Sequence, residues 1–443
     1  CETEKEQTIV EDTSVEETGR YEFFSTTGES SVAYSGQTVR HLLIDDLKGY
    51  VADLDERLLT EVIVPGSVEN DLWFYLDTIS DVGAEVPHGF SLELPLEQQS
   101  YGDLSAGKNL IEKLAGNDSV TDHKDWSSSF LGWEEGISPQ ELVESWFVQL
   151  DAQASSWGTT PNSILGEPLE HVYVTESGQD LQQLLQKFLR VAICFSQGAD
   201  DYLDDDVEGK GLLASHIPEE GATYSALEHA WDEAFGYFGA AQNYVEWTDE
   251  QIATERAFDI DQNGTIDLRS EVNWGHSINA AKRDLSVDGL DLTTDAWIAF
   301  YEGRRLLSGT VGRELTSEEF TELQAYRNQA IASWEKIIAA NSIHYINKLL
   351  EDYEKLDTTE FSFSEVAKHW SELKGFSFAF QFNPRSPLEE QDFKQLHSLI
   401  GMAPDLERVE EYKIELIEAR ELLGMAFGFE EGILGDENGQ NGL

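Results

Sequence analysis

Basic residues are scarce in this chain. Its 443 residues include 29 lysines and arginines against 86 aspartates and glutamates, so the formal net charge is −57 at pH 7. Nucleic-acid binding needs a basic face for phosphate contacts, and attraction to anionic lipid needs a polybasic segment. The composition therefore argues against nucleic acid as a partner and excludes polybasic attraction to membranes. Such acidity is typical of a protein in a salty medium, or of a surface that collects cations.

Proline and long apolar runs are also scarce. There are 10 prolines, and no apolar run approaches the roughly 18 residues that a membrane-spanning helix requires. Few prolines favour long uninterrupted helices over a sandwich of many short strands. With 22 phenylalanines and 11 tryptophans, the chain can fill a sizeable core. Its length suits two or three domains, or one large helical array.

Only two cysteines occur. Cys194 lies in an apolar helical run, which predicts a buried free thiol. Cys1 stands first and is followed by an acidic segment, which is typical of a mature bacterial lipoprotein lipidated on that cysteine. We therefore expect attachment to a membrane through Cys1 and a place in the bacterial cell envelope, as an outer-membrane lipoprotein facing the periplasm or the cell surface. The alternative is that the chain begins there through trimming.

Helical periodicity dominates the chain after an acidic tether at 1–20. Residues 21–430 are expected to form an all-α domain, and 431–443 a flexible tail. Residues 79–136 are irregular, rich in Gly, Ser and Asp, which is typical of functional or ligand-ordered segments. Ser138 and Thr316 each precede a glutamate by three residues, as helix-capping residues do. One helix is expected to begin near residue 38 and to keep an apolar face through residue 51, and a second, shorter helix is expected to include 72–76. The other expected helices are 138–157, 180–197, 224–247, 249–257, 270–285, 294–308, 316–356, 363–378, 388–400 and 405–427.

A weak internal repeat suggests two related helical bundles packed together. The segments 231–236 (WDEAFG) and 370–375 (WSELKG) share the pattern W-x-E-x-x-G, and each follows a helix that ends in acidic residues. A period of about 140 residues divides the domain into pseudo-repeats at about 21–290 and 291–430. The match covers three positions, so chance similarity is the alternative.

The strongest local motif is 258–271, FDIDQNGTIDLRSE. Oxygen-bearing side chains alternate along it and Gly264 allows a sharp turn, as in the helix-loop-helix sites that bind calcium. An acidic residue is usual at the twelfth position, but here Ser270 stands there and Glu271 follows. We therefore predict a structural Ca²⁺ site with altered closure, between the two repeat motifs; the alternative is a solvated turn. The predicted ligands are Asp259, Asp261, Asn263, Thr265 through its carbonyl, Asp267 and, as a further candidate, Glu271.

Two helices each carry a histidine and a glutamate one turn apart, a spacing that presents both to one metal ion or one proton. A third histidine follows the Asp-rich loop and could join such a site. The alternative is that these histidines are buried and bonded within their own helices. The candidates for this second metal site are His229, Glu233, His276, His369 and Glu372.

No enzyme signature stands out. The chain lacks G-x-S-x-G, H-E-x-x-H, a P-loop and a strand-linked G-x-G-x-x-G. No catalytic or organic-cofactor residue is therefore predicted, and a binding role is favoured over enzymatic activity. Paired carboxylates for hydrolysis of peptide or glycan are the enzymatic alternative, because 86 acidic residues offer many pairs.

Four segments together resemble an uncharacterised family of bacterial envelope lipoproteins. They are SVAYSGQ (31–37), HAWDEAFGYFG (229–239), WSELKGF (370–376) and QFNP (381–384). That family is similar in setting to the imelysin-like proteins, beside which it is found in iron-uptake gene clusters. The resemblance implies an all-helical, two-bundle lipoprotein tied to metal acquisition. The imelysin motif G-x-H-x-x-E is not matched, since Gly275 directly precedes His276 and Asn279 stands where the glutamate would fall.

The sequence thus predicts a calcium-stabilised, lipid-anchored binding protein of the cell envelope, acting in metal (iron) uptake. Its partners would be the membrane, through Cys1, and an envelope transport complex or further copies of itself. The alternatives are a carboxylate-dependent hydrolase and a structural subunit whose acidic surfaces are bridged by calcium.

Overall fold

Helices carry the regular structure of this protein, as the low proline content predicts. The computed structural model describes residues 19–77, 79, 85–118, 122–157 and 162–443. Within those ranges there are fourteen α-helices and no β-strand, and backbone pairing outside helices is confined to isolated bridges. The predicted all-α fold is confirmed. None of the described helices is both long and apolar enough to cross a membrane.

The helices divide into long packed ones and short ones within loops. The α-helices are α1 (Ser35–Thr60), α2 (Ser67–Leu76), α3 (Tyr101–Ser105), α4 (Trp126–Ser129), α5 (Pro139–Ser156), α6 (Leu181–Leu189), α7 (Ala226–Phe238), α8 (Asp249–Glu255), α9 (Gly275–Asp284), α10 (Leu292–Thr310), α11 (Ser317–Tyr353), α12 (Phe363–Ser377), α13 (Glu390–Ile400) and α14 (Val409–Ala426). Two π-helical segments, Arg190–Phe195 and Gln197–Tyr202, prolong α6.

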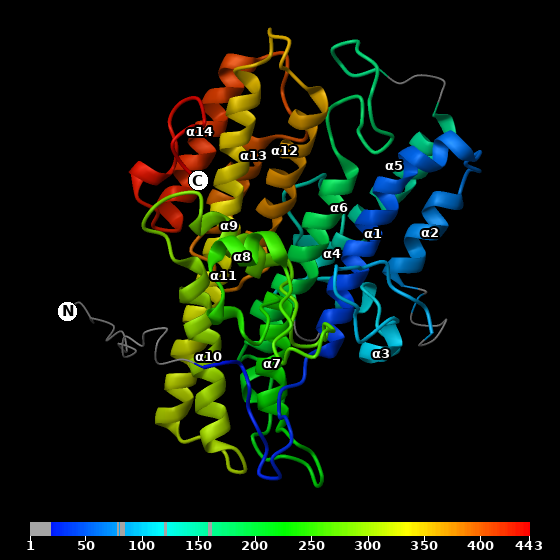
Figure 1. Ribbon diagram of the computed structural model, residues 1–443. Coiled ribbons are helices and arrows are strands. Elements are labelled where there is room, and N and C mark those ends of the chain that lie inside the picture. Colours follow the sequence, from blue (N-terminus) through cyan, green and yellow to red (C-terminus); the bar gives the residue numbers. More distant parts are fainter. Residues whose placement is uncertain (1–18, 78, 80–84, 119–121, 158–161) are drawn as a thin grey trace, which may run out of the picture.

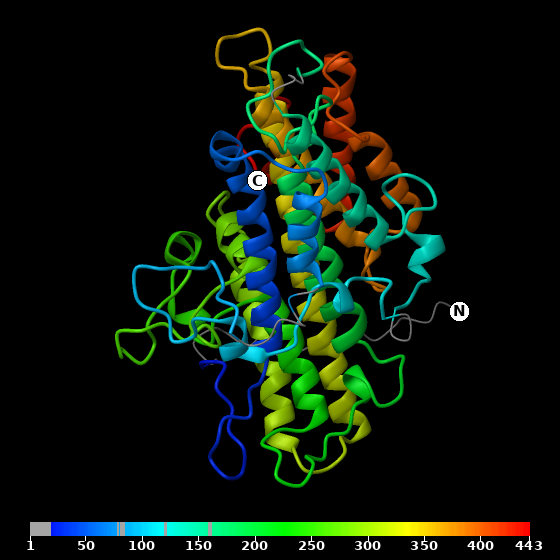
Figure 2. The ribbon, with the colours of Figure 1, turned by 90° about the vertical axis from the view of Figure 1, so that its right-hand side faces the viewer.

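The longest helix, α11, has 37 residues and runs along much of the molecule (Figure 1). It packs against α9, α10, α12 and α14, while α6 packs between α1 and α12. Helix α7 connects the helices around α11 with those around α6, because it contacts both α10 and α1. Seen after a quarter turn, α1 runs through the middle part of the molecule (Figure 2).

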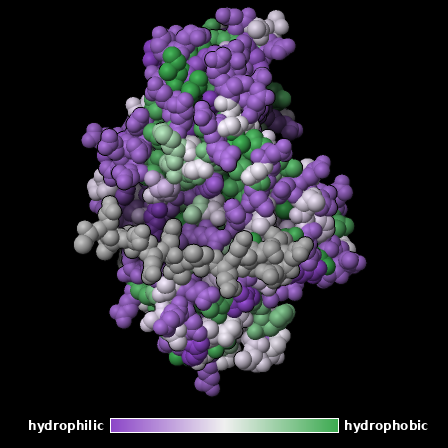
Figure 3. Space-filling model, turned by 90° about the vertical axis from the view of Figure 1, so that its left-hand side faces the viewer, coloured by the Kyte–Doolittle hydropathy of each residue, from purple (hydrophilic) through white to green (hydrophobic). Residues whose placement is uncertain are grey.

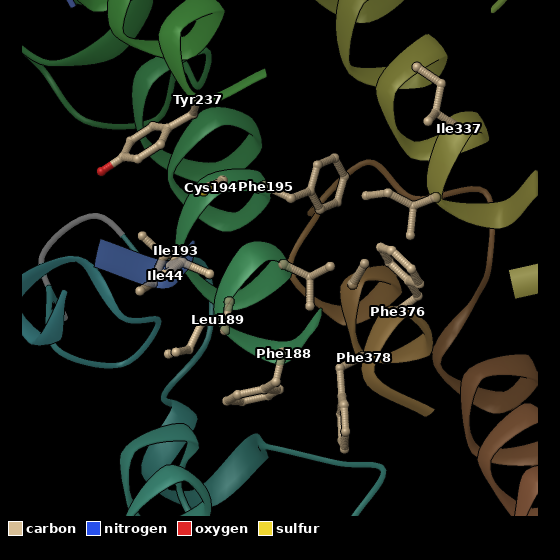
Figure 4. Packing of buried hydrophobic residues seen from close by; sticks show 14 of the residues in the cluster. Ile44, Phe188, Leu189, Ile193, Cys194, Phe195, Tyr237, Ile337, Phe376 and Phe378 are labelled. Carbon is tan, nitrogen blue, oxygen red and sulfur yellow. The ribbon is translucent and has the colours of Figure 1, made fainter. Parts of the chain in front are cut away.

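One continuous hydrophobic core extends from Tyr21 to Leu443. Within it, Phe188 on α6 lies beside Phe378, which follows α12, with ring centroids 5.1 Å apart (Figure 4). Phe195 on the π-helical segment packs against Trp334 of α11, with ring centroids 5.4 Å apart. Both predicted pseudo-repeats contribute to this core. The outer face seen in Figure 3 is mostly hydrophilic, in keeping with the excess of acidic residues.

Capping side chains begin several helices where the sequence predicts. The hydroxyls of Ser138 and Thr316 accept the backbone N–H of Glu141 and Glu319, and each glutamate carboxylate accepts the N–H of its capping residue in return. These reciprocal bonds satisfy backbone donors that the first helical turn leaves open. Both predicted capping boxes are confirmed.

Two predicted helix boundaries are wrong. The helix expected over 224–247 ends at Phe238, because Gly239 takes a left-handed conformation (φ 89°) and terminates it. The helix expected from residue 270 begins only at Gly275, because the preceding residues form a turn and then a bridge between Val272 and Ala257. Side-chain periodicity did not reveal these backbone interruptions.

Gly303 on α10 is required by close packing. A Cβ atom there would lie 2.0 Å from the ring of Trp231, whose indole N–H donates to the carbonyl of Phe300. We expect Gly303→Ala to lower the free energy of unfolding by about 1–3 kcal/mol, through overpacking. Urea denaturation followed by circular dichroism would measure it.

Gly309 on the same helix provides the matched control, because nothing lies within 4 Å of a Cβ built there. Gly309→Ala should leave stability unchanged, or raise it by up to about 1 kcal/mol through helix propensity. Equal stabilities of the two variants would contradict the packing argument.

Candidate functional site

The Asp-rich loop forms a closed turn between α8 and α9. An antiparallel bridge between Ala257 and Val272 closes its base. Gly264 adopts a left-handed conformation (φ 85°) with open space around it, so the glycine is needed for its backbone angle and not for room. The backbone N–H of Gly264 donates to Asp259, and that of Asn263 donates to both Asp259 and Asp261. These bonds curl the loop around its own carboxylates.

Three carboxylates converge inside the loop. Oxygens of Asp259, Asp261 and Glu271 all lie within 4.8 Å of one another. Glu271 reaches the group from the thirteenth position because its N–H donates to the carbonyl of Asp267, which shortens the path by one turn. Burial raises the pKa of Glu271, and repulsion from the two aspartates raises it further. Oxygens bound to one Ca²⁺ at about 2.4 Å can be at most about 4.8 Å apart, so the spacing fits such an ion.

The other predicted ligands make different contacts. The side-chain oxygen of Asn263 accepts the N–H of Thr265, and its amide donates to Glu97. Asp267 accepts the N–H of Arg269 and the side-chain amide of Gln98. Asp267 therefore stands outside the three-carboxylate group and connects the loop to residues 97 and 98.

Residues 87–101, hereafter the strap, join the Asp-rich loop to α1. A parallel bridge pairs Leu96 with Ile266, and the N–H of Leu268 donates to the side chain of Gln98. At its other side the strap is held by Asp46 of α1, which accepts the N–H of Gly89 at 2.9 Å and the hydroxyl of Tyr101. Figure 2 shows the strap beside the green loop. The sequence prediction of an irregular, functional region includes this segment.

A cleft of about 920 Å³ lies between the strap, α1, α6, α8 and α9. The strap supplies His88 and Phe90, and the residues flanking the Asp-rich loop supply Arg256 and Gly275. The volume is in the range of small-molecule sites. The cleft and the loop are therefore parts of one structure, since the same segments build both.

Asp45 joins the walls of the cleft. Its carboxylate accepts from Arg190 at 2.5 Å and from Arg256 at 3.0 Å. Burial alone would raise the pKa of Asp45, but the two guanidinium groups outweigh it and lower the pKa to about 2. Arg256 also stacks over the rings of Phe90 and Trp274, at 5.0 and 5.2 Å. Its backbone is left-handed (φ 64°), a conformation that a non-glycine residue keeps only when its surroundings hold it.

Positive charge collects in this cleft. The lining contains five basic side chains and three carboxylates, whereas the whole chain has 29 basic and 86 acidic residues. Lys187 pairs with Glu372 of α12 at 3.1 Å. In the described ranges no carboxylate lies within ion-pair distance of Lys48 or Lys282. The basic lining residues are Lys48, Lys187, Arg190, Arg256 and Lys282.

The predicted histidine–glutamate site is spread over separate contacts. On α7, His229 bonds to the carbonyl of Ala33 at 3.0 Å, and its other nitrogen lies 3.8 Å from Glu233. Glu233 in turn accepts from Gln37. Among the described residues, the one group of three or more acidic, histidine or cysteine side chains with metal-ligand spacing is the carboxylate group of the loop.

The other two histidines have partners of their own. His369 on α12 bonds to Asp352 at 2.6 Å. His276 is buried and accepts the indole N–H of Trp334 at 2.7 Å, and burial holds its pKa well below the usual range. Glu372 accepts the hydroxyl of Tyr345 and pairs with Lys187, so it lies behind the cleft wall.

The chain belongs to the protein family described as "Domain of unknown function (DUF4856)". The family profile matches residues 135–397, more than half of the chain. The matched range includes the Asp-rich loop and the α6, α8 and α9 walls of the cleft. No curated protein and no solved structure matches the chain. Membership of an uncharacterised family is thus confirmed.

Sequence reasoning missed the cleft, because its residues come from distant segments. Lys48, Lys187 and Lys282 are separated by 139 and 95 positions, and no spacing rule connects them. A usable signal was present: in so acidic a chain, lysines on the apolar-patterned helices 38–51, 180–197 and 270–285 are unusual.

The Lys48 ammonium should titrate at an unusual pH. Burial lowers its pKa to about 8, and the positive charge of Lys187 acts in the same direction. After reductive ¹³C-methylation, NMR should show one lysine resonance that titrates near pH 8 and is missing from the Lys48→Gln variant. Persistence of a charged Lys48 to pH 10 would contradict this.

Proposed function

We propose that this protein is a calcium-stabilised binding protein of the bacterial cell envelope, with its ligand held in the cleft. One observation carries the proposal: the segments that curl around the three carboxylates are also those that form the cleft wall. Arg256 and Gly275 flank the loop and line the cleft, and Ile266 of the loop pairs with Leu96 of the strap. An ion in the loop would therefore fix the width of the cleft.

Calcium suits the loop better than a transition metal does. All candidate ligands are oxygens, and hard divalent cations prefer carboxylates and carbonyls, whereas zinc and copper prefer imidazole and thiolate. Bringing Asp259, Asp261 and Glu271 together costs electrostatic repulsion, which a divalent cation would offset. Glu271 keeps lone pairs for an ion although its two oxygens accept the N–H groups of Ile260 and Asp267.

Binding, and not catalysis, is the role that the cleft supports. Two of its three carboxylates, Asp45 and Asp46, already accept hydrogen bonds from arginines, from Tyr101 and from the backbone, and the third, Asp53, is exposed to solvent. Such engaged groups are supports for the walls and not a free acid–base pair. The membrane anchor at Cys1 lies outside the described residues, and it stays a proposal together with the outer-membrane location, iron uptake and an envelope transport partner.

Calcium should stabilise the protein. At a free calcium concentration 100 times the dissociation constant, the free energy of unfolding should rise by about 2.7 kcal/mol. Thermal melts with added calcium and with a chelator would measure the difference, and calorimetry would measure the binding. The Asp259→Asn and Asp261→Asn variants should lose most of this stabilisation, because each removes one of the converging charges.

Asp288→Asn is the control, because Asp288 is an exposed aspartate outside the loop. It removes one negative charge from the same highly acidic chain. The comparison therefore distinguishes Ca²⁺ bound at the loop from Ca²⁺ that only screens the overall negative charge. Calcium stabilisation that is equal in the control and the loop variants would refute the site.

The loop and strap should loosen together when calcium is removed. The N–H of Glu97 donates to the carbonyl of Ile266, and the N–H of Ile266 donates to the carbonyl of Pro95, both at 2.9 Å. Hydrogen exchange at these two amides should speed up on chelation, because opening the loop frees both bonds. The amide of Ala339, buried in α11, provides an internal reference. If chelation left hydrogen exchange in the strap unchanged, the proposed coupling between the Asp-rich loop and the cleft wall would be wrong.

A further inference from the structure

We propose that the cleft binds a small organic polyanion, a molecule carrying two or more carboxylate or phosphate groups. This inference rests on the proposed function, since it names the ligand class of the same site. Its basis is the convergence of Lys48, Lys187 and Lys282, from three different helices, on one cavity in a protein of net charge −57.

The three lysines have unequal partners. Lys187 pairs with Glu372 at 3.1 Å, and Arg190 and Arg256 share the single carboxylate of Asp45, which leaves that group with one net positive charge. Lys48 and Lys282 line the same cavity with no ion-pair partner within the parts of the chain that the structure describes. The ammonium groups of Lys48 and Lys282 are thus available to a ligand, in a lining that has five basic side chains against three carboxylates.

Neighbouring positive charges also favour an anion in the cleft. Lys282 is exposed to solvent, yet partial desolvation of its ammonium lowers its pKa, and the charges of Lys187, Arg283 and Arg256 lower it further. An anionic ligand would supply the counter-charge that the fold leaves out, and charge-assisted hydrogen bonds to it would be strong.

The cleft also indicates the size and shape of the ligand. Its volume of about 920 Å³ admits a small molecule with several functional groups. Aromatic rings from the strap, α2 and α12, namely those of Phe90, Tyr75 and Phe376, line it beside the lysines. A ligand therefore meets charge at one part and apolar surface at another.

The acidity of the whole protein favours multivalent anions. A single negative charge gains one short-range contact while the protein's overall field repels it. A molecule with two or three anionic groups would contact several of the basic lining residues at once, and these extra contacts would offset that repulsion. We therefore expect polyanions to bind and acetate to bind much more weakly.

Isothermal titration calorimetry of the full chain, with calcium kept saturating, tests the proposal. The probes are propane-1,2,3-tricarboxylate and fructose 1,6-bisphosphate, with acetate and glucose as weak-binding references. The first two separate carboxylate from phosphate recognition, and binding of either supports the proposal. Lys48→Gln and Lys282→Gln should each weaken binding about tenfold or more, the value of one charge-assisted hydrogen bond.

Lys394→Gln is the matched control. Lys394 is an exposed lysine on α13 whose ammonium pairs with Glu390 at 2.6 Å, and it is not part of the cleft lining. The affinity of this variant should equal that of the wild type, and circular dichroism melts would show that all three variants fold. Binding by neither polyanion, or equal affinities in all variants, would overturn the proposal.

The pH dependence supplies a second readout. A bound anion stabilises protonated Lys48, whose pKa is about 8 without ligand, so affinity should fall as the pH rises from 7 to 9. Lys187 and Arg190 of the α6 segment, Asp45 of α1 and Glu372 of α12 also act on this ammonium. The Lys48→Gln variant should lose most of this pH dependence, and an unaltered profile in that variant would count against the proposal.

The two proposals fail in different ways. If calcium stabilises the protein but no polyanion binds, the ligand class is wrong while the proposed function stands. If calcium has no effect on stability or binding, the proposed function fails, whatever the anions do.

Discussion

The carboxylate of Asp45 is the contact on which the functional face depends. Helix α1 carries it into a largely buried position, where Arg190 of the α6 segment and Arg256 beside the Asp-rich loop both pair with it. A buried carboxylate without partners would be costly, and so would either guanidinium, so each group requires the others. Because Arg256 directly precedes the Asp-rich loop and stacks on the strap, one ion-pair cluster fixes α1, α6, the loop and the strap together.

The loop and the cleft have opposite electrostatic character. The loop gathers three carboxylates, whose repulsion a bound cation would relieve, and the cleft gathers positive charge in a protein with few basic residues. Arg256 and the strap contact the loop and also line the cleft, so the two regions share part of their walls. Occupation of one would stiffen the segments that shape the other, which is the physical basis for coupling two binding events.

The sequence revealed whatever depends on neighbours in the chain. The Ser138 and Thr316 caps and the turn at Gly264 are local, and the structure has them where they were expected, as it has most of the helices. Contacts between segments that are distant in the sequence could not be predicted from it. Nothing in the pattern around Lys48 pointed to Lys282, and Glu271 reached the carboxylates through a turn that simple position counting did not foresee. His276 was singled out for chemistry, yet it lies in the core beside Trp334.

The bridge between Ala257 and Val272 gives the Asp-rich loop a closed neck. Chain entry and exit therefore lie side by side there, next to Arg256 and close to Gly275 of the cleft lining. A change in the shape of residues 258–271 would reach the cleft through this neck and through the pairing of Ile266 with Leu96. The Asp-rich loop is thus a part of the cleft wall, and its removal would alter the cleft itself.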